Sequence, residues 1–441
     1  MPPLEGLLRR CQARRGVWSS FKPVIARRHV GSIDLVRELC QLVRIRSEVA
    51  VSETGEVVRR NYEEAVRAVA RLAEEAGLEV EVLELEFRGG VIPTVLAEAG
   101  GRGRRMALVS HYDVVPARGP WLVDGREIDP YEPVVVEGKV YGRGAADDKS
   151  AIVASIAALA ELLEEGSSLR YRPCVVVTGD EEVGGYGVRA LLEAGYRWDR
   201  VVILDAGADY LSVGASGVIH GWIRVRGRSG HAGYPHRAVN PVEAAIKLAN
   251  YLLDAYKPCR ARRISRFNSP PGSPIPKVWG RFSFTIMKLA PGEPEKHNRI
   301  PAEAMLGFDV RLIPEEDLDE ALNELYSYVS EAAARLGVEC EVKAWGQRGW
   351  YTRDDEFVKE ALSAARSAYA AVGLRPEIGV AAELGGNDGT FFYEADMPVV
   401  AFGAMRPECN VHSENEFVYV RDLVLLKEFV KHLLGGEQRN A

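Results

Sequence analysis

The sequence predicts an α/β protein whose open sheet is interrupted by a smaller α+β segment. Up to about residue 213, short apolar runs of strand length alternate with helical patterns, which is typical of a sheet with helices on both faces. From about residue 214 the strands alternate apolar and polar residues, as half-buried antiparallel strands do, and after residue 346 the α/β pattern resumes. Residues 31–213 and 347–441 are therefore expected to form one domain, with residues 214–346 inserted into it.

Hydrophobic periodicity places the elements of the first domain. Ser150 is the expected N-cap of one of its helices, because serine accepts hydrogen bonds from the first free backbone N–H groups of a helix. The expected elements are, in order, helices at 33–45 and 62–76, strands at 78–85, 93–97 and 106–110, a helix at 150–164, strands at 174–177 and 201–204 and, after the insertion, a helix at 356–372, a strand at 398–402 and a helix at 423–434.

The insertion is expected to hold a four-stranded antiparallel sheet. A loop rich in serine and proline at 268–277 separates two parts of it. Its expected strands are 218–226, 282–289, 305–313 and 341–344, and its expected helices are 241–256 and 316–336.

Composition favours a cytoplasmic globular enzyme. The 441 residues are 47% hydrophobic and 27% charged, and the formal net charge of −7 argues against nucleic acid as a partner. No apolar stretch approaches the roughly 20 residues of a membrane span. The six cysteines lack CxxC spacing, which favours reduced thiols. The basic residues 1–30 are expected to form a poorly ordered arm rather than a secretory signal.

Acidic residues and histidine follow the three most apolar strands. Glu181 and Glu182 come just after 174–177, His111 follows 106–110, and Asp205 follows 201–204. Ligands of an open α/β sheet gather outside the carboxyl ends of its strands. Adjacent carboxylates face different ways, so one can bind a metal while its neighbour reaches a water molecule on that metal. The pattern predicts a metal-dependent hydrolase.

The candidate ligands carry only nitrogen and oxygen donors, which suits zinc, cobalt or manganese. They are His111, Asp147, Glu182, Asp205 and His412. Asp147 lies in a glycine-rich turn ahead of a helix, where its two oxygens can bridge two ions that activate a water and polarise a carbonyl. Glu181 is the expected general base, which takes a proton from a metal-bound water to form hydroxide. Asp113 is expected to hydrogen-bond His111 and fix its tautomer.

Other functions fit the sequence less well than metal-dependent hydrolysis. Taken alone, a run of acidic residues usually forms a solvated turn, and a single His-x-Asp sequence is too common to indicate a metal site. The glycine-rich turns at 142–144 and 184–187 match neither of the nucleotide-binding patterns GxxxxGK[ST] and GxGxxG. A non-catalytic metal-binding relative would have lost a ligand or the base, and none is missing. A two-metal phosphoesterase would want more basic residues near the carboxylates.

Four stretches together resemble the dinuclear-zinc family of acetylornithine deacetylase, succinyl-diaminopimelate desuccinylase, aminoacylase, glutamate carboxypeptidase and cytosolic dipeptidases. They are residues 110–116, 141–149, 179–185 and 412–416, in the family's order. The resemblance implies a zinc-peptidase-like catalytic domain and a lid and dimerisation domain. It also implies one metal on His111, Asp147 and Asp205, and a second on Asp147, Glu182 and His412.

The same resemblance assigns roles within the insertion and the loop that follows it. His231 matches a histidine that reaches a partner subunit's active site and stabilises an oxyanion. Asn298 and Arg311 match lid positions that contact substrate, and Arg311 would pair with a substrate carboxylate. Gly385, Gly386 and Asn387 resemble the loop that lines the substrate pocket. A homodimer joined through the lids is therefore expected.

The resemblance leaves the substrate open between two branches of the family. The deacylases usually carry glutamate at the position of Asp205, whereas Asp205 and the triplet 147–149 are similar to the dipeptidases. Residues 298–304 and 401–412 are more similar to the deacylases. The expected substrate is an N-acyl amino acid, as for desuccinylase or acetylornithine deacetylase, with a dipeptide or carboxypeptidase substrate as the alternative.

Overall fold

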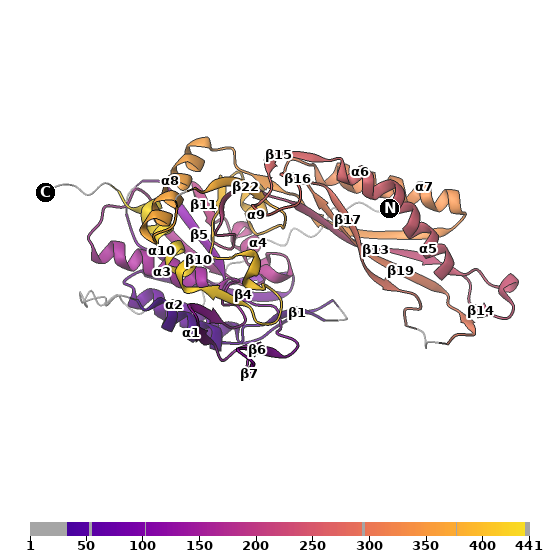
Figure 1. Cartoon of the computed structure of the whole chain (residues 1–441), viewed down its shortest axis with the longest axis horizontal. Helices are drawn as coiled ribbons and strands as arrows, with labels where there is room; N and C mark the ends of the chain where they lie inside the picture. Colours follow the sequence, from indigo (N-terminus) through magenta and orange to yellow (C-terminus); the bar gives the residue numbers. More distant parts are fainter. Residues whose placement is uncertain (1–32, 53–54, 102, 293–295, 376, 437–441) are drawn as a thin grey trace. The chain divides into compact units, whose positions relative to one another are not determined.

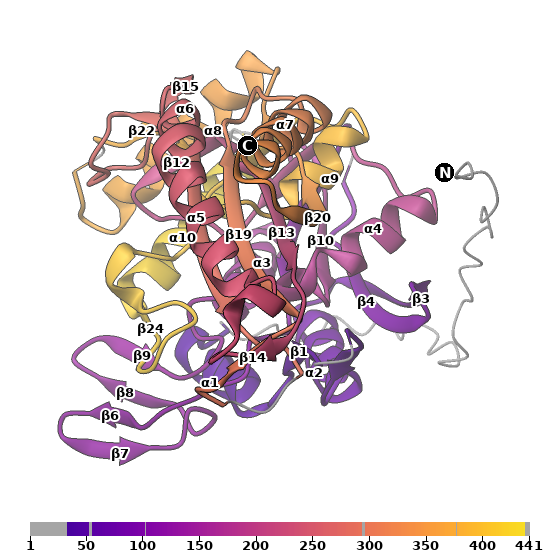
Figure 2. The same cartoon turned by 90° about the vertical axis from the view of Figure 1, so that its right-hand side faces the viewer.

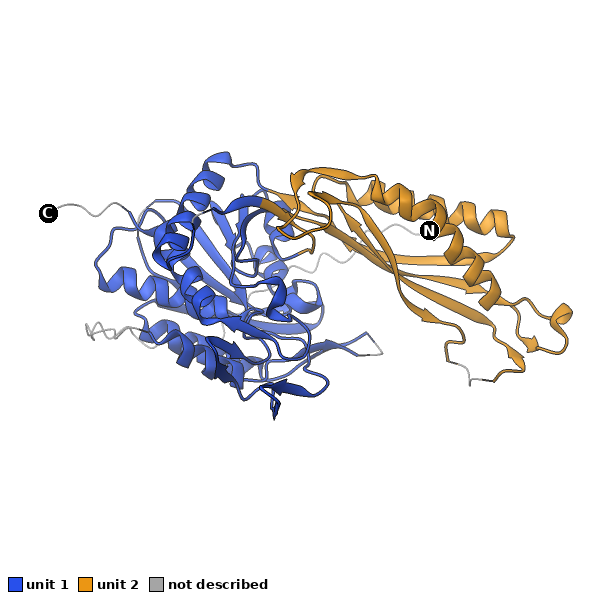
Figure 3. Ribbon diagram, in the orientation of Figure 1, with its two compact units in different colours: residues 1–213, 352–380, 387–441 blue, residues 214–351, 381–386 orange. Residues whose placement is uncertain are grey.

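The computed structural model describes residues 33–52, 55–101, 103–292, 296–375 and 377–436. The predicted arm at 1–30 lies outside them. The chain divides into two compact units (Figure 3). Unit 1 comprises the chain up to Val213, Thr352–Val380 and the chain from Asn387, and unit 2 comprises Gly214–Tyr351 and Ala381–Gly386. The first segment of unit 2 thus ends later than the predicted residue 346, and unit 2 has a second segment at 381–386. Strands β12 (Tyr210–Ala215) and β22 (Gly379–Glu383) pair with each other, and each passes from unit 1 into unit 2.

A nine-stranded mixed sheet organises unit 1, although its edge strand β21 and parts of β12 and β22 belong to unit 2 (Figure 1). The strand order is β21-β12-β23-β11-β5-β10-β4-β3, with β22 beside β12. The central strands β10, β5, β11 and β23 are parallel, and β4 runs antiparallel to β10. The strands are β3 (Glu79–Phe87), β4 (Gly90–Glu98), β5 (Arg105–His111), β10 (Arg172–Thr178), β11 (Arg200–Ile203), β12 (Tyr210–Ala215), β21 (Trp350–Tyr351), β22 (Gly379–Glu383) and β23 (Val399–Ala401).

Helices cover both faces of this sheet. The connection from β5 to β10 and the connection from β10 to β11 run in opposite directions along the sheet, so right-handed crossovers place α3 and α4 on opposite faces. Helix α3 also contacts α2 and α10, and α10 contacts α8, whereas α4 contacts α9. The helices are α1 (Leu35–Arg44), α2 (Tyr62–Glu75), α3 (Lys149–Glu164), α4 (Tyr186–Glu193), α8 (Asp355–Ala371), α9 (Gly389–Glu394) and α10 (Val420–Leu434). The predicted α/β sheet with helices on both faces is confirmed.

The predicted N-cap of α3 is wrong. The helix begins at Lys149, its N-cap residue is Asp148, and Ser150 lies within the first turn. The Ser150 hydroxyl donates to the carbonyl of Ala146 at 3.2 Å. The tight turn that contains Asp147 already leads the backbone into the helix, so the helix starts before the serine.

Short strands at the edge of unit 1 connect two segments that carry candidate ligands. Strand β9 pairs antiparallel with β24, with Tyr141 opposite Phe417. The turn that contains Asp147 follows β9, and His412 precedes β24, so this pairing brings the two segments together. The short strands are β1 (Val49–Val51), β2 (Val57–Arg59), β6 (Trp121–Val123), β7 (Arg126–Ile128), β8 (Val134–Val136), β9 (Lys139–Tyr141) and β24 (Phe417–Tyr419).

Unit 2 contains the predicted four-stranded antiparallel sheet, in the order β17-β19-β13-β20. Helices α5 and α7 pack against this sheet, and Figure 2 shows them along the strands. Apolar residues of both layers, among them Ile223, Leu248 and Phe308, form the core. The elements are β13 (Gly217–Arg226), β14 (Gly230–His231), α5 (Pro241–Tyr251), a π-helical turn (Leu252–Tyr256), α6 (Lys257–Ala261), β15 (Ile264–Asn268), β16 (Lys277–Trp279), β17 (Arg281–Lys288), β18 (Arg299–Ile300), β19 (Glu303–Leu312), α7 (Leu318–Leu336) and β20 (Glu339–Gln347).

Within the part of the chain that the structure describes, every helix is too short or too polar to cross a bilayer. The described cysteines, Cys40, Cys174, Cys259, Cys340 and Cys409, are free thiols.

A buried arginine holds the helices of unit 2 to each other. The Arg260 guanidinium is fully buried and lies 2.5 Å from Glu316 Oε1 and 3.0 Å from Glu324 Oε2. Replacing Arg260 by leucine leaves two partly buried carboxylates without their cation, which typically costs about 3–5 kcal/mol. We therefore expect Arg260→Leu to lower the midpoint of urea denaturation strongly.

The matched control is Arg335→Leu. This arginine pairs with Glu331 on the surface of α7 and is largely exposed, so its loss should leave the midpoint unchanged. Equal midpoints for the two variants would contradict the structural role of Arg260.

Candidate metal centre

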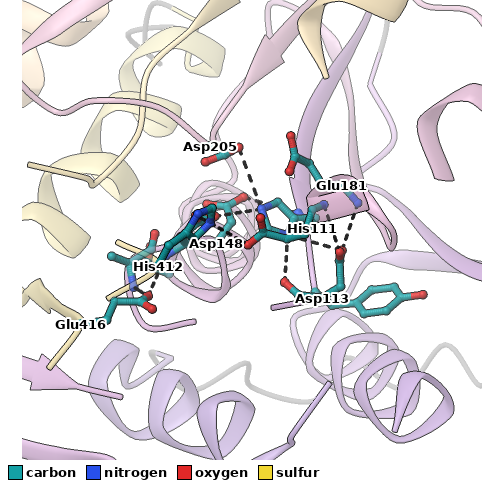
Figure 4. A network of polar contacts seen from close by, with 12 residues as sticks. His111, Asp113, Asp148, Glu181, Asp205, His412 and Glu416 are labelled. Atoms are coloured by element: carbon teal, nitrogen blue, oxygen red, sulfur yellow. Dashed lines mark hydrogen bonds and ion pairs between the residues drawn. The ribbon is translucent and has the colours of Figure 1, made fainter. Parts of the chain in front are cut away.

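The candidate ligands meet where the parallel strands of unit 1 end (Figure 4). His111 is the last residue of β5, and it lies opposite Thr178, the last residue of β10. Glu181 and Glu182 form a short 3₁₀ turn just after β10. Asp205 follows β11, which is parallel to β5. The register of the three strands therefore brings their carboxyl ends to one edge of the sheet.

Asp147 lies between two imidazoles that come from distant parts of the sequence. Its Oδ1 is 3.0 Å from His111 Nε2, and its Oδ2 is 3.0 Å from His412 Nε2. Each oxygen of one carboxylate thus faces a different histidine. This is the arrangement that a carboxylate needs to bridge two metal ions.

The remaining predicted ligands lie beside the same two histidines. His412 Nε2 is 3.0 Å from Glu182 Oε1, and His111 Nε2 is 3.9 Å from Asp205 Oδ2. Two groups have ligand atoms within 4.8 Å of one another: His111, Glu181 and Asp205, and Asp147, Glu182 and His412. The structure therefore brings all five predicted ligands and the predicted base into one cluster with two candidate metal sites. Glu181 lies close enough to be a ligand as well as a base.

Carboxylates outnumber the histidines in this cluster. Burial raises the pKa of Glu181 well above its usual value, and the nearby carboxylates of Asp388 and Asp205 raise it further. Burial likewise raises the pKa of Glu182, with Asp147 adding to the effect. The negative charges of these carboxylates repel one another at this short range. Divalent cations would relieve that repulsion, and the nitrogen and oxygen donors fit zinc, cobalt or manganese.

The two histidines and Asp147 stabilise each other's charge. Burial alone would raise the pKa of Asp147, but its hydrogen bonds to His111 and His412 lower it overall. The hydrogen bonds from His412 to Asp147 and Glu182 raise the pKa of His412 to about 10.

Asp113 contacts His111, although not mainly in the predicted way. His111 Nδ1 lies 3.0 Å from the backbone carbonyl of Asp113 and 3.4 Å from its Oδ1. The buried Asp113 carboxylate instead accepts from the backbone N–H groups of Glu181 and Glu182, at 3.4 Å and 3.3 Å. Asp113 therefore links the end of β5 to the turn that carries the expected base.

Sequence reasoning missed Glu416, which supports the bridging residue from behind. Its fully buried carboxylate accepts from the backbone N–H groups of Ala146 and Asp147, at 3.0 Å and 3.2 Å. Arg143 lies 2.5 Å from Glu416 and also donates to the carbonyl of Ser413. Glu416 thus joins the Asp147 turn to the segment of His412. The stretch 412–416 was recognised from sequence, but only the fold identifies its last carboxylate as the link.

A second missed contact anchors the turn of Glu181. Asp180, with a φ of 65°, is buried just ahead of it. Its carboxylate lies 2.5 Å from the Arg59 guanidinium and accepts a 2.7 Å hydrogen bond from the Tyr62 hydroxyl. Both partners are about 120 residues earlier, so no local pattern could have identified them.

His231 and Asn298 come together within unit 2. Strands β14 and β18 pair, and the backbone N–H of Ala232 donates to the carbonyl of Asn298 at 2.8 Å. The His231 side chain is exposed, and its Nδ1 accepts a 3.0 Å hydrogen bond from the backbone N–H of Gly233. In the neutral imidazole the proton is therefore on Nε2, where it is a donor.

Of the other residues predicted to contact substrate, Arg311 pairs with a carboxylate of the protein, and Gly385, Gly386 and Asn387 lie in a loop. Arg311 forms a forked ion pair with Asp309, with both distances 3.0 Å. Gly385 and Gly386 end the second segment of unit 2, and Asn387 begins the last segment of unit 1. The Asn387 Oδ1 accepts from the N–H of Gly389, at the start of α9. Their contact with substrate stays a prediction.

The sequence profile of peptidase family M20/M25/M40 matches residues 107–435 of this chain. A succinyl-diaminopimelate desuccinylase of Methylocella silvestris is 28% identical over 357 residues, which cover 78% of this chain and 85% of the relative.

Two solved structures share the fold. One is an M20 family metallo-carboxypeptidase from Sulfolobus solfataricus, with a TM-score of 0.71 and 17% identity, covering 91% of this chain and 98% of the other. The second is the di-peptidase Dug1p of Saccharomyces cerevisiae, with a TM-score of 0.70 and 17% identity, covering 90% and 95%. The predicted combination of a zinc-peptidase-like domain with a smaller α+β domain is thereby confirmed.

Removing the negative charge of Asp147 should reduce metal binding. We expect Asp147→Asn, which keeps the shape of the side chain, to lower bound zinc from about two ions per chain to one or none. Elemental analysis after removal of metal with a chelator and reloading measures this ratio. Asp124→Asn, in an exposed turn, should keep full occupancy. Full occupancy in Asp147→Asn would contradict the bridging assignment.

Proposed function

Because the chain belongs to peptidase family M20/M25/M40, we propose that it hydrolyses the amide bond of an N-acyl amino acid at the cluster around Asp147. It is a metallohydrolase of a family that acts on amide or peptide bonds. One observation carries the proposal: the two oxygens of Asp147 face His111 and His412, with Glu181 beside them.

The cluster would hold two divalent ions, with zinc as the expected metal. His111, Asp147 and Asp205 would hold one, and Asp147, Glu182 and His412 the other. When bound, the ions polarise the scissile carbonyl and acidify a water molecule. The backbone contacts of Asp113 and Glu416 keep the donor groups in place before any ion binds.

Glu181 is the proton carrier of the proposed reaction. It takes a proton from the attacking water and passes it to the nitrogen of the leaving amine. His231 donates Nε2–H to the oxygen of the scissile carbonyl as negative charge develops there.

Two observations bear on the substrate. The curated relative is named for desuccinylation, which favours an N-acyl amino acid with an acidic acyl group. Asp205, in place of the glutamate usual among the deacylases, favours the alternative of a dipeptide or a carboxypeptidase substrate. Turnover of matched panels of N-acyl amino acids and dipeptides by zinc- or cobalt-loaded protein separates these, and a phosphodiester serves as the negative control. Cleavage of none of the amides would contradict the proposal.

We further propose that the protein works as a homodimer joined through unit 2. Strand β17 is an edge of the four-stranded sheet, and its residues Ile286 and Met287 are about half exposed, at 50% and 47%. An exposed edge strand with apolar side chains is suited to pairing with a second copy. His231, exposed in the same unit, would then complete the site of the partner.

The role of Glu181 can be tested by measuring turnover and bound metal in the same variant. Glu181→Gln should retain at least most of its metal but lose about 10²–10⁴-fold in kcat, because it cannot accept the proton. Steady-state kinetics combined with elemental analysis measures both quantities. Glu127→Gln, on the exposed strand β7, is the matched control. A near-normal kcat in Glu181→Gln would contradict the role of Glu181 as the proton carrier.

Subunit complementation tests the proposed role of His231. Glu181→Ala and His231→Ala proteins should each be inactive. Mixed heterodimers should recover activity, because one of their sites combines an intact base with an intact histidine. Recovery is measured after subunit exchange has been verified with two affinity tags. A fully active monomer, or no recovery after exchange, argues against a histidine supplied by the partner.

A further inference from the structure

Asp180 differs in its contacts from the two carboxylates that follow it. Of the described residues, Glu181 and Glu182 each belong to one candidate metal group, whereas Asp180 belongs to neither. The Asp180 carbonyl accepts from the backbone N–H groups of Gly185 and Tyr186, at 2.9 Å and 3.2 Å, and so closes the turn that carries both glutamates. Because Glu181 follows Asp180 directly within this turn, a contact that fixes Asp180 also limits where Glu181 can lie.

The Asp180 side chain is held by a charged fork from the end of β2. Arg59 Nε lies 3.0 Å from each carboxylate oxygen of Asp180, and Arg59 Nη2 lies 2.5 Å from Oδ2. Two N–H groups on one carboxylate fix its direction as well as its distance. The Tyr62 hydroxyl donates to Oδ1 at 2.7 Å, and the Asp180 side chain is fully buried. Arg59 therefore compensates a buried negative charge that would otherwise add to the carboxylates of the metal centre.

Two glycines leave the space that this contact needs. A Cβ added to Gly90, at the start of β4, would lie 2.5 Å from Arg59 Nη1. A Cβ added to Gly179 would lie 2.5 Å from the Tyr112 hydroxyl and 2.9 Å from the Tyr62 ring. The guanidinium and the two tyrosines thus pack directly against the backbone, and larger residues at these glycines would displace them.

The strand pair that carries Arg59 is itself fixed to the end of β5. Val49 lies opposite Arg59 in the ladder of β1 and β2. The N–H of Val49 donates to the carbonyl of Val114 at 3.0 Å, and the N–H of Val114 donates to the carbonyl of Ser47 at 2.9 Å. Val114 directly follows Asp113, whose carboxylate accepts from two backbone N–H groups of the same turn. Asp113 and Arg59 therefore hold one turn through different groups, its backbone N–H groups and the side chain that precedes them.

We propose that Arg59 is a positioning residue that acts through Asp180 on the proton carrier Glu181. The ion pair keeps the Glu181 carboxylate where it can take a proton from the attacking water. This inference rests on the proposed amide hydrolysis. Among the described residues, the Arg59 guanidinium forms its hydrogen bonds with Asp180 and with none of the candidate ligands. Its loss should therefore impair turnover more than metal binding.

Two adjacent arginines provide a matched kinetic test. Arg59→Gln should lower kcat about 10–100-fold with bound metal and KM little changed, since a small displacement of a reacting group can cost about 10²-fold in rate. Arg59→Lys, which keeps the charge but loses the planar fork, should lie between. Arg60→Gln is the control and should keep the wild-type kcat, because Arg60 is more than half exposed and its partner Glu48 retains Arg46 at 2.9 Å. Equal kcat values in Arg59→Gln and Arg60→Gln would overturn the proposal.

Combining Arg59→Gln with Glu181→Gln separates positioning from a general structural role. A residue that acts through Glu181 has no further effect once Glu181 can no longer accept a proton. Arg59→Gln should therefore lower kcat in the wild-type background and leave it unchanged in the Glu181→Gln background. The same fold-loss in both backgrounds would overturn the proposal, because Arg59 would then act on the fold or on metal binding.

Hydrogen exchange of the metal-free protein tests the contact without any substrate. Arg59→Gln should speed amide exchange in the peptide that spans residues 180–186, whereas Arg60→Gln should keep the wild-type rates, and so should the peptides of α8 in both variants. If the protein cleaves no amide but exchange rises in this way, the proposed function fails while the hold of Arg59 on the turn is supported. Unchanged exchange in residues 180–186 overturns that hold. Faster exchange with an unchanged kcat overturns the role of Arg59 in positioning the proton carrier.

Discussion

The carboxylate of Asp147 is the interaction on which the rest of the metal centre depends. Its two oxygens face histidines that are 301 positions apart in the sequence, His111 and His412. Their separation is therefore determined by long-range structure: the end of β5, the turn after β9, and the pairing of β9 with β24. Glu416 fastens the last two of these together through the backbone of Asp147 itself. A shift of any one segment would change the distance from the carboxylate to an imidazole.

Concentrated negative charge is the second constraint on this site. Protein folding alone would not gather so many partly buried carboxylates, because each pays a desolvation penalty and repels its neighbours. The raised pKa of Glu181 and of Glu182 expresses that conflict. The arrangement becomes favourable when divalent cations are bound, so the electrostatics and the choice of donors lead to the same interpretation.

The sequence by itself determined the main helices and central strands, the four-stranded sheet of the insertion and the residue types at the metal centre. These follow from local signals: hydrophobic periodicity is set by the geometry of one helix or strand, and His111, Glu181 and Asp205 directly follow strands whose carboxyl ends must meet. The sequence pattern places the N-cap of α3 at Ser150, two residues late, because the turn before the helix is held by the distant Glu416. Only the tertiary structure could decide the role of Glu416. Its carboxylate holds the turn of Asp147, and these partners are close in space but about 270 residues apart along the chain.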